Sequence, residues 1–446
     1  MFNLLCSILV TGCGLGFPPT AVVAAASPKT FNVVTYGAKG DGVADDSGAV
    51  ERALKAAAAA GGGRVEFPCG EFSIESSQGS APANRSLLYL KEAGAVQVTG
   101  QGACTHVFTL QPRKSVLEFE DSSHIQVSNL RITAVNTVYL ETYGMGAGSA
   151  VRFSGVRYGA ISNLEVDGAS AGALYFTKGT SNSSMVGNNI HDTYGSGIWE
   201  DDCGSISSSS CAPSRPPANN SYLLNTLTNT SLASQVALSL DDGNASSFAI
   251  VKGNIISWTR RMIAGTPFAA QCIQANNTSD ASIVNNTCTG TPWNGIVITT
   301  GVAGQSKRVT IQGNVIQNSG TSYRGGNGIV IYDDPRGNGI SGFNVIHNTI
   351  TRSSLDGILV EPWQQNHIHD GQVSNNTVQL SDQRSPGSHF GIEVVRSSGI
   401  QVTSNTISCD GRCIAAGIRI QSSPSTTPAS TANFVTNILG PSLLVQ

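Results

Sequence analysis

The chain has 446 residues and a formal net charge of −3; 12% of its residues are charged and 50 are glycine. It contains no block of basic residues, so composition gives no reason to expect nucleic acid or an anionic membrane surface as a partner. A hydrophobic share of 40% is ordinary for a folded protein and excludes wholesale disorder.

The first predicted element is a targeting segment. Residues 1–28 contain no Asp, Glu, Lys or Arg, and small residues surround Ala26. This pattern favours a signal peptide over residues 1–26, although lipidation at Cys13, in "VTGC", is an alternative. We therefore expect a secreted, periplasmic or cell-surface protein. No later stretch is long and apolar enough to predict a membrane span.

The next segment, within residues 27–125, holds the predicted N-terminal cap and first coils. The Ala-rich run after Ser47 predicts a helix that begins at Ser47 or an adjacent Asp and stops at the glycines of 61–63. It is the clearest helical stretch of the chain. A solenoid needs its open end covered, and an amphipathic helix can do that.

A repeat then occupies residues 126–422. An Asn followed at the second position by an apolar residue returns at intervals of 26 to 36 residues. The anchors are Asn129, Asn163, Asn189, Asn225, Asn254, Asn286, Asn314, Asn348, Asn376 and Asn405. Stacked Asn side chains can form a hydrogen-bonded ladder inside the turns of a solenoid.

Between these anchors a second phrase recurs, as in "GIVIT" (295–299), "GIVIY" (328–332) and "GILVE" (357–361). Both phrases alternate with period two, which is typical of strands. Short strands in coils of variable length predict one all-β, right-handed parallel β-helix with an N-terminal capping helix. We interpret residues 423–446 as a C-terminal tail and end cap.

Eight cysteines follow the predicted signal peptide. An even number in a secreted chain favours disulfides. Cys203–Cys211 and Cys409–Cys413 would be local loop links, and Cys69–Cys104 and Cys272–Cys288 are the simplest remaining pairs.

The run "YGAKGDGVADDSGAVERALKAA" and the following "GGGRVEFPCGEF" closely resemble the opening of the pectate-lyase-like superfamily. This superfamily includes rhamnogalacturonase- and epimerase-like, polygalacturonase-like and phage tailspike proteins. The resemblance implies a right-handed parallel β-helix, in which Asp41, Asp45 and Asp46 belong to the cap. "GDGVADD" also resembles a Ca²⁺ loop, although a tight glycine turn with helix-capping carboxylates accounts for it. The scaffold hosts many chemistries, so the resemblance implies fold more than reaction.

Acidic residues end several of the apolar phrases, and alignment of the strands puts them in one row. Asp201 aligns with Asp241 one coil on, followed by Asn276, Thr299, Tyr332 and Glu361. Two nearby carboxylates can serve as general acid and as base or nucleophile in glycoside hydrolysis. We therefore predict a polysaccharide hydrolase, acting on pectin or another acidic glycan, with these catalytic candidates: Asp201, Asp202, Asp241 and Asp242.

Aromatic and polar residues near this row are predicted to bind the substrate, because exposed aromatic rings are platforms for sugars. These substrate-binding candidates are Trp199, Tyr332, Asp333, Glu361, Trp363 and Arg261. A competing row precedes the glycines on the opposite edge: Asn294, Asn327 and Asp356, with His191 and Asp192 upstream of Gly197.

Three alternatives to hydrolysis remain. A lyase or epimerase of uronate-containing glycans would need a proton-abstracting group, with these candidates: Lys178, Lys252, Arg260, Arg261, His191 and His367. The acid cluster could instead hold Ca²⁺, although no cofactor or metal is expected otherwise. The third alternative is a non-catalytic glycan-binding or surface-structural β-helix.

Overall fold

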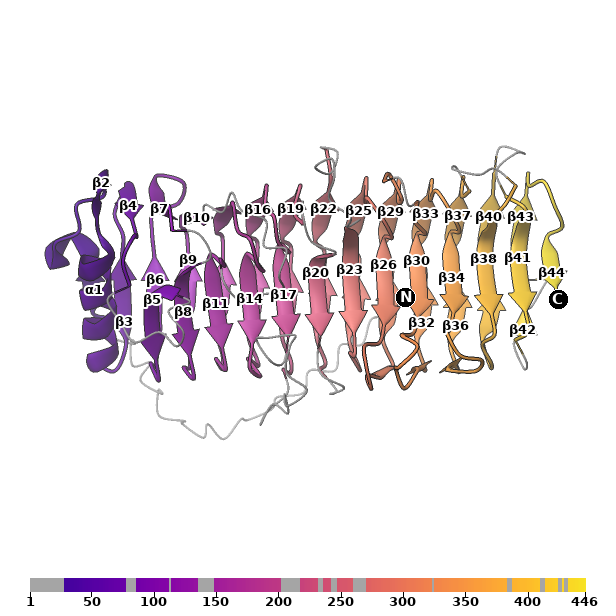
Figure 1. Ribbon diagram of the computed structural model, residues 1–446, viewed down its shortest axis with the longest axis horizontal. Helices are drawn as coiled ribbons and strands as arrows, with labels where there is room; N and C mark the ends of the chain where they lie inside the picture. Colours follow the sequence, from indigo (N-terminus) through magenta and orange to yellow (C-terminus); the bar gives the residue numbers. More distant parts are fainter. Residues whose placement is uncertain are drawn as a thin grey trace, which may run out of the picture.

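The computed structural model describes residues 28–77, 86–111, 114–134, 148–201, 217–231, 236–241, 247–259, 270–322, 325–382, 387–409, 414–423, 427–428 and 432–446. Within these ranges, three long parallel sheets run side by side along the molecule (Figure 1). Successive coils each give one strand to each sheet, which is the arrangement of a parallel β-helix.

Sheets I and II contain the shorter strands, most of them three residues long. Sheet I consists of β1 (Thr30–Asn32), β3 (Gly63–Glu66), β6 (Val96–Thr99), β9 (Gln126–Ser128), β12 (Ala160–Ser162), β15 (Ser184–Val186), β18 (Ser221–Leu223), β21 (Ile250–Lys252), β24 (Ser282–Val284), β28 (Thr310–Gln312), β32 (Asn344–Ile346), β36 (Gln372–Ser374), β39 (Gln401–Thr403) and β42 (Thr427–Pro428). Sheet II consists of β2 (Asp41–Asp45), β4 (Gly70–Ser73), β7 (Thr105–Thr109), β10 (Arg131–Ala134), β13 (Glu165–Asp167), β16 (Asn189–His191), β19 (Thr226–Thr228), β22 (Ile255–Ser257), β25 (Thr287–Thr289), β29 (Val315–Gln317), β33 (Thr349–Thr351), β37 (Thr377–Gln379), β40 (Thr406–Ser408) and β43 (Phe434–Thr436).

Sheet III carries the "GI" phrases and the acids that follow them. It consists of β5 (Ser86–Lys91), β8 (Ser115–Glu120), β11 (Val151–Ser154), β14 (Leu174–Thr177), β17 (Ile198–Asp201), β20 (Val236–Asp241), β23 (Gln271–Asn276), β26 (Ile296–Thr299), β30 (Ile329–Tyr332), β34 (Ile358–Glu361), β38 (Phe390–Val395), β41 (Ala416–Gln421) and β44 (Leu443–Val445). A small fourth sheet joins β27 (Ser306–Lys307), β31 (Ile340–Ser341) and β35 (Ile368–His369).

The interior of the solenoid is filled by aliphatic side chains that stack coil upon coil. In sheet I the paired central residues of β21, β24, β28 and β32 are all fully buried: Val251, Ile283, Ile311 and Val345. Because side chains alternate between the two faces of a strand, the flanking residues face outward. The period-two pattern of the sequence therefore fixes which residues reach the core.

The predicted asparagine ladder is present from β16 to the C-terminal coils. Asn254 is typical of it: its backbone N–H and its side-chain Nδ2 both donate to Asn286 Oδ1 at 2.9 Å, and Nδ2 also donates to the carbonyl of Tyr222 at 2.9 Å. The same pattern links Asn188, Asn225, Asn254, Asn286, Asn314, Asn348, Asn376, Asn405 and Asn433. Since all of these amides except that of the partly exposed Asn433 are buried, the ladder satisfies polar groups that would otherwise be costly to bury.

Three of the predicted anchors were wrong. Asn129 and Asn163 have left-handed backbone conformations, with φ of 56° and 53°, and they lie one residue before the ladder position. There Leu164 donates its N–H to Asn188 Oδ1, so leucine replaces asparagine at that level. Asn189 is exposed on β16, and its neighbour Asn188 is the ladder residue.

Helix α1 (Ser47–Ala59) lies at the N-terminal end of the solenoid, after the 3-10 helix η1 (Val33–Tyr36) (Figure 1). Its buried face, which includes Val50 and Leu54, packs against β1, β3 and β5. Asp46 precedes the helix, but its carboxylate accepts the N–H groups of Lys39 and Gly40 instead of capping helical N–H groups. The described residues contain no helix with the length and apolar character of a membrane span.

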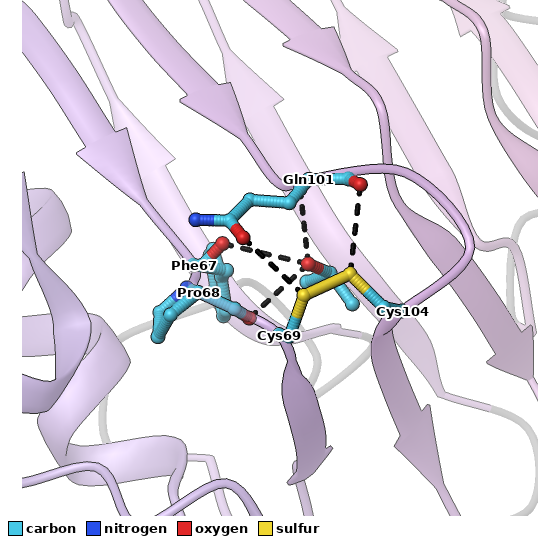
Figure 2. Close-up of a disulfide and its surroundings, with 6 residues drawn as sticks. Phe67, Pro68, Cys69, Gln101 and Cys104 are labelled. Atoms are coloured by element: carbon cyan, nitrogen blue, oxygen red, sulfur yellow. Dashed lines mark hydrogen bonds between the residues drawn. A yellow bond between two sulfur atoms is a disulfide. The ribbon is translucent and has the colours of Figure 1, made fainter.

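Two predicted disulfides are confirmed. Cys69–Cys104 joins the loops that follow β3 and β6, next to the side chain of Gln101 (Figure 2). Cys272–Cys288 links β23 to β25. Cys409 is also disulfide-bonded, whereas Cys203, Cys211 and Cys413 lie outside the described residues, as does the predicted signal peptide. Loops of 35 and 16 residues correspond to stabilisation of about 4 and 3 kcal/mol in the chain-entropy account.

Candidate functional site

The predicted row of polar residues exists on the outer face of sheet III. Asp201 pairs in register with Asp241, Asp241 with Asn276, and Asn276 with Thr299. Tyr332 pairs with Glu361 further along the same sheet. Paired strands lie about 4.8 Å apart, so the row presents one side chain about every 4.8 Å along the solenoid.

Asp201 is turned toward the preceding coil. Its carboxylate accepts a hydrogen bond from the Tyr175 hydroxyl at 2.5 Å and one from Thr177 Oγ1 at 2.6 Å. Only 6% of the residue is exposed. Burial, together with the charge of Asp201, holds the pKa of Tyr175 well above its usual value, so this phenol keeps its proton and donates.

Asp241 is turned the other way, toward the following coil. Its two carboxylate oxygens accept from Asn276 Nδ2 at 3.0 Å and Asn277 Nδ2 at 3.2 Å. The residue is partly exposed, in contrast to Asp201. The two acids thus share a register, but these hydrogen bonds join them to opposite neighbouring coils.

The other acids of this region have different positions. Glu200 points into the solenoid, where Asn220 and the Tyr222 hydroxyl donate to it. Asp202, Asp242 and Arg261 lie outside the described residues. Among the described residues, no three His, Cys, Asp or Glu side chains are placed to hold a metal ion together.

A second outward row, two residues earlier on each strand, supplies the cationic and aromatic neighbours of Asp201. Arg152 is buried with its Nε 3.4 Å from Glu118 Oε1, and its guanidinium lies 4.8 Å from the ring centre of Tyr175. The Tyr175 ring in turn lies 5.8 Å from that of Trp199, which is partly buried. Glu118, Arg152, Tyr175 and Asp201 therefore form a continuous polar network over four strands.

A lysine lies beside this network. Lys178 Nζ is 2.9 Å from Glu120 Oε1, and 39% of its side chain is exposed. The Tyr89 hydroxyl donates to the other oxygen of Glu120 at 2.8 Å. Lys178 is thus the accessible cation nearest in sequence to Thr177 and the Asp201 network.

The remaining predicted substrate residues gather around β30 and β34. Asp333 is wholly buried and holds the loop that contains Trp363 and His367, so its carboxylate does not face solvent. Tyr332, Glu361 and Trp363 are at least partly exposed. Burial and the charge of Asp334 raise the pKa of Tyr332.

The competing row before the glycines forms internal hydrogen bonds. The Asn327 N–H donates to Asn294 Oδ1, the Asp356 N–H to Asn327 Oδ1, and the Phe390 N–H to Asp356 Oδ1. All three side chains are buried, so this row is a second ladder that links coils. His191 lies elsewhere, on β16 of sheet II, beside Asp192 and Glu165.

Sequence reasoning missed Tyr175, Arg152 and Glu118 as neighbours of the acidic row. Each occupies the outward position aligned with Trp199, so strand alignment extended toward the N-terminus could have found them. The coils that contain these three residues lack the "GI" phrase, so the phrase could not be used to align their strands with β17.

Comparison with known families supports the fold. The profile described as "Rhamnogalacturonase A/epimerase, pectate lyase-like" matches residues 30–260, and "Right handed beta helix region" matches residues 271–441. Mannuronan C5-epimerase AlgE5 of Azotobacter vinelandii is 44% identical over 69 residues, which are 14% of this chain. The matched stretch spans only 7% of that relative's own length.

Solved structures agree over nearly the whole chain. The A-module of mannuronan C-5 epimerase AlgE4 from A. vinelandii has a TM-score of 0.58 and 16% identity, covering 94% of this chain and 97% of that one. A GH87 α-1,3-glucanase catalytic unit from Streptomyces thermodiastaticus has a TM-score of 0.62 and 17% identity, covering 94% and 70%. The adhesin PfbA of Streptococcus pneumoniae has a TM-score of 0.59 and 15% identity, covering 93% and 91%. At these identities the similarity establishes the fold alone.

Proposed function

Because the chain belongs to the rhamnogalacturonase A/epimerase, pectate-lyase-like family, we propose that it is a secreted enzyme that modifies a uronate-containing polysaccharide. The polymer would lie along the outer face of sheet III. The proposed reaction is proton transfer at the carbon next to the uronate carboxyl group, as in an epimerase or a lyase. The observation that carries this proposal is the contact between the Tyr175 hydroxyl and the Asp201 carboxylate at 2.5 Å.

Proton transfer at this carbon has three requirements, and the network offers a candidate for each. A group must remove the proton, another must return one in an epimerase, and a cation must stabilise the negative charge that develops on the uronate carboxyl group. In the hydrogen bond between them Tyr175 donates and Asp201 accepts, so Asp201 is the candidate to remove the proton and Tyr175 the candidate to return one. Lys178 is an accessible cation close in sequence to Thr177, and the buried Arg152 lies 4.8 Å from the Tyr175 ring centre.

Hydrolysis by Asp201 and Asp241 is the second candidate, and their shared register favours it. Neighbouring strands bring the two residues to about the spacing of the carboxyl pair in a retaining glycosidase. The hydrogen bonds weaken this candidate, because Asp201 accepts from residues of the preceding coil and Asp241 from residues of the following coil.

Product analysis separates these reactions. The purified chain is incubated with mannuronan, polygalacturonate and an α-1,3-glucan. Epimerisation changes the proton NMR spectrum of the polymer and incorporates solvent deuterium, without new chain ends. A lyase creates unsaturated uronates that absorb ultraviolet light, whereas a hydrolase creates reducing ends without that absorbance.

Two substitutions test the assigned residues. Loss of an acid–base group should lower kcat by about 100-fold or more, so Asp201→Asn should abolish most turnover under the proton-transfer proposal. Asp241→Asn should match that loss only if the two acids act as a hydrolytic pair. Unchanged turnover in Asp201→Asn would contradict both candidates, and an unmodified substrate panel with wild-type protein would leave a binding or structural role.

Two further expectations belong to this proposal. Disulfides persist in oxidising compartments, so the confirmed pairs support an extracellular or periplasmic location. Helix α1 packs on the first strands, and we infer that it covers the open N-terminal end of the core.

A further inference from the structure

A second cluster of side chains lies further along the same face, in the loops that follow β30 and β34. Its centre is the carboxylate of Asp333, which has no exposed surface. Oδ1 accepts a hydrogen bond from the backbone N–H of Trp363 at 2.5 Å, and Oδ2 lies 3.0 Å from Nδ1 of His367. One buried carboxylate thus fixes both the indole-bearing residue and the imidazole.

This arrangement determines which nitrogen of His367 faces solvent. A carboxylate accepts, so Nδ1 carries the proton and donates, and Nε2 of the neutral ring is an acceptor. His367 has 31% of its side chain exposed. Among the described residues, no partner occupies Nε2.

Trp363 provides an apolar surface beside it. The residue is 56% exposed, whereas the other described tryptophans, Trp199, Trp258 and Trp293, are partly or fully buried. The hydrogen bond to Asp333 orders the backbone that carries the exposed indole, so little backbone entropy is lost when a ring packs on the indole.

Neighbouring coils hold the loop between β34 and β35 in place. Arg396 donates from Nη1 to the carbonyl of Trp363 at 3.3 Å and from Nη2 to Glu361 at 3.2 Å. The Ile340 N–H donates to the carbonyl of His367 at 2.9 Å. Glu361 and Arg396 are each about 40% exposed, so a charged pair borders the indole.

We propose that Trp363 and His367 form a sugar-binding subsite, distinct from the Asp201 network, that holds a distant unit of the same polysaccharide chain. The indole packs on the apolar face of a pyranose ring, and His367 Nε2 accepts a hydrogen bond from one of its hydroxyl groups. Asp333 is the positioning residue for both. This proposal depends on the proposed function in one respect: it takes from it that the ligand is a polysaccharide.

The spacing of the coils predicts what length of ligand reaches both places. From β17, which carries Asp201, to β34 there are five strand steps, or about 24 Å at the usual spacing. The length of one sugar unit in an extended chain is similar to one strand step. A polymer lying along sheet III therefore reaches both regions, whereas a disaccharide cannot.

Binding is measured apart from turnover, by calorimetry and by affinity electrophoresis in gels containing mannuronan, with α-1,3-glucan in parallel. Trp363→Ala and His367→Gln should each weaken binding of the retained polymer about tenfold. Binding of a mannuronan disaccharide at the Asp201 network should be unchanged. His369→Gln is the matched control, because His369 contacts Asp370, whose side chain is 76% exposed, and it should bind like wild type.

Each outcome decides whether Trp363 and His367 form a subsite. It is overturned if both variants bind the polymer as wild type does, if His369→Gln weakens binding equally, or if wild type is retained by neither polysaccharide. If a polysaccharide gel retains the wild-type protein but no product forms, only the enzymatic proposal is contradicted. The subsite can still be tested, because the variants are compared by binding and not by turnover.

The positioning role of Asp333 has its own readout. Asp333→Asn should shift the nitrogen NMR signals of His367 away from those of the ring protonated at Nδ1 and should weaken polymer binding as much as His367→Gln does. Unchanged signals with unchanged binding would overturn that role. Thermal unfolding of each variant shows whether it is folded, and His367→Gln tests the subsite even if Asp333→Asn is unstable.

Discussion

Two arginines on the outer face of sheet III have nearly the same surroundings in different parts of the solenoid. Arg152, on β11, lies 3.4 Å from Glu118 and 4.8 Å from the ring centre of Tyr175. Arg419, on β41, lies 2.7 Å from Glu393 and 4.9 Å from the ring centre of Phe390. Both arginines contact a glutamate and an aromatic ring, but Glu118 and Tyr175 lie on the two strands that flank β11, whereas Glu393 and Phe390 both lie on β38.

The regions differ in burial and in one hydroxyl group. The Arg152 and Glu118 side chains are 2% and 0% exposed, whereas those of Arg419 and Glu393 are 23% and 11% exposed. Tyr175 continues the network to Asp201 through its hydroxyl, but Phe390 has no such group. The contacts of Arg152 therefore extend through Tyr175 to the candidate site, whereas those of Arg419 do not extend through Phe390.

The largest expected effect comes from removing the buried arginine. Arg152→Met leaves Glu118 as a buried charge without its cation, which should lower the free energy of unfolding by about 3–5 kcal/mol. Arg419→Met should cost about 1 kcal/mol, because that pair is partly solvated. Urea unfolding of both variants measures the difference, and equal losses would contradict the contrast drawn from burial.

The second prediction uses pH to examine the more exposed pair. Burial and the charge of Asp356 raise the pKa of Glu393 to about 7, against the opposing effect of Arg419. The folded state then holds this proton more tightly than the unfolded state, whose value is 4.5. Stability from this group is fully present below about pH 4.5 and is lost as the pH rises through 7, by up to about 3 kcal/mol.

Glu393→Gln removes that titration. The decline in the free energy of unfolding between pH 5 and pH 8 should be smaller in this variant than in wild type, as measured by urea unfolding across that range. A variant with the same decline as wild type would assign the pH dependence to other groups.

The third prediction concerns the hydroxyl that separates the two regions. Tyr175→Phe makes the first region resemble the second and removes a hydrogen bond to a charged acceptor, at a cost of about 2 kcal/mol. Turnover of the polysaccharide should fall as well, because Asp201 loses its nearest proton partner. Full activity in a folded Tyr175→Phe variant would show that the hydrogen bond between Tyr175 and Asp201 is not needed for the reaction.

Most of the architecture was predictable because it depends on periodicity. Alternating aliphatics and returning asparagines specify strands, coils and stacking, and the register of Asp201 on Asp241 followed from aligning "GI" phrases. The Asn129 and Asn163 anchors failed because an asparagine is also favoured in the left-handed turn just before the ladder. Alignment of asparagines alone cannot distinguish an asparagine in the ladder from one in the left-handed turn before it.

The partners of the site residues were less predictable. Tyr175 and Asp201 are 26 residues apart and meet because their side chains lean across neighbouring strands. The sequence also did not indicate which side chains are buried. Asp333 and Glu361 both end strand phrases, yet Asp333 is wholly buried and Glu361 is partly exposed to solvent. Such differences depend on loops between coils, whose lengths vary without a repeating pattern.

The smallest expected change in stability is at Lys178, and it gives the sharpest separation of structure from function. Its pair with Glu120 is partly exposed, so Lys178→Met should alter the free energy of unfolding by no more than about 0.5 kcal/mol. If this lysine meets a uronate carboxyl group, the variant should show a higher KM or lower kcat on mannuronan. Arg308→Met is the control, because Arg308 forms an exposed pair with Asp280 on another part of the surface. Equal kinetics in the two variants would leave the Asp201 network without its substrate-facing cation, and the distinction between the two arginine regions would then concern stability alone.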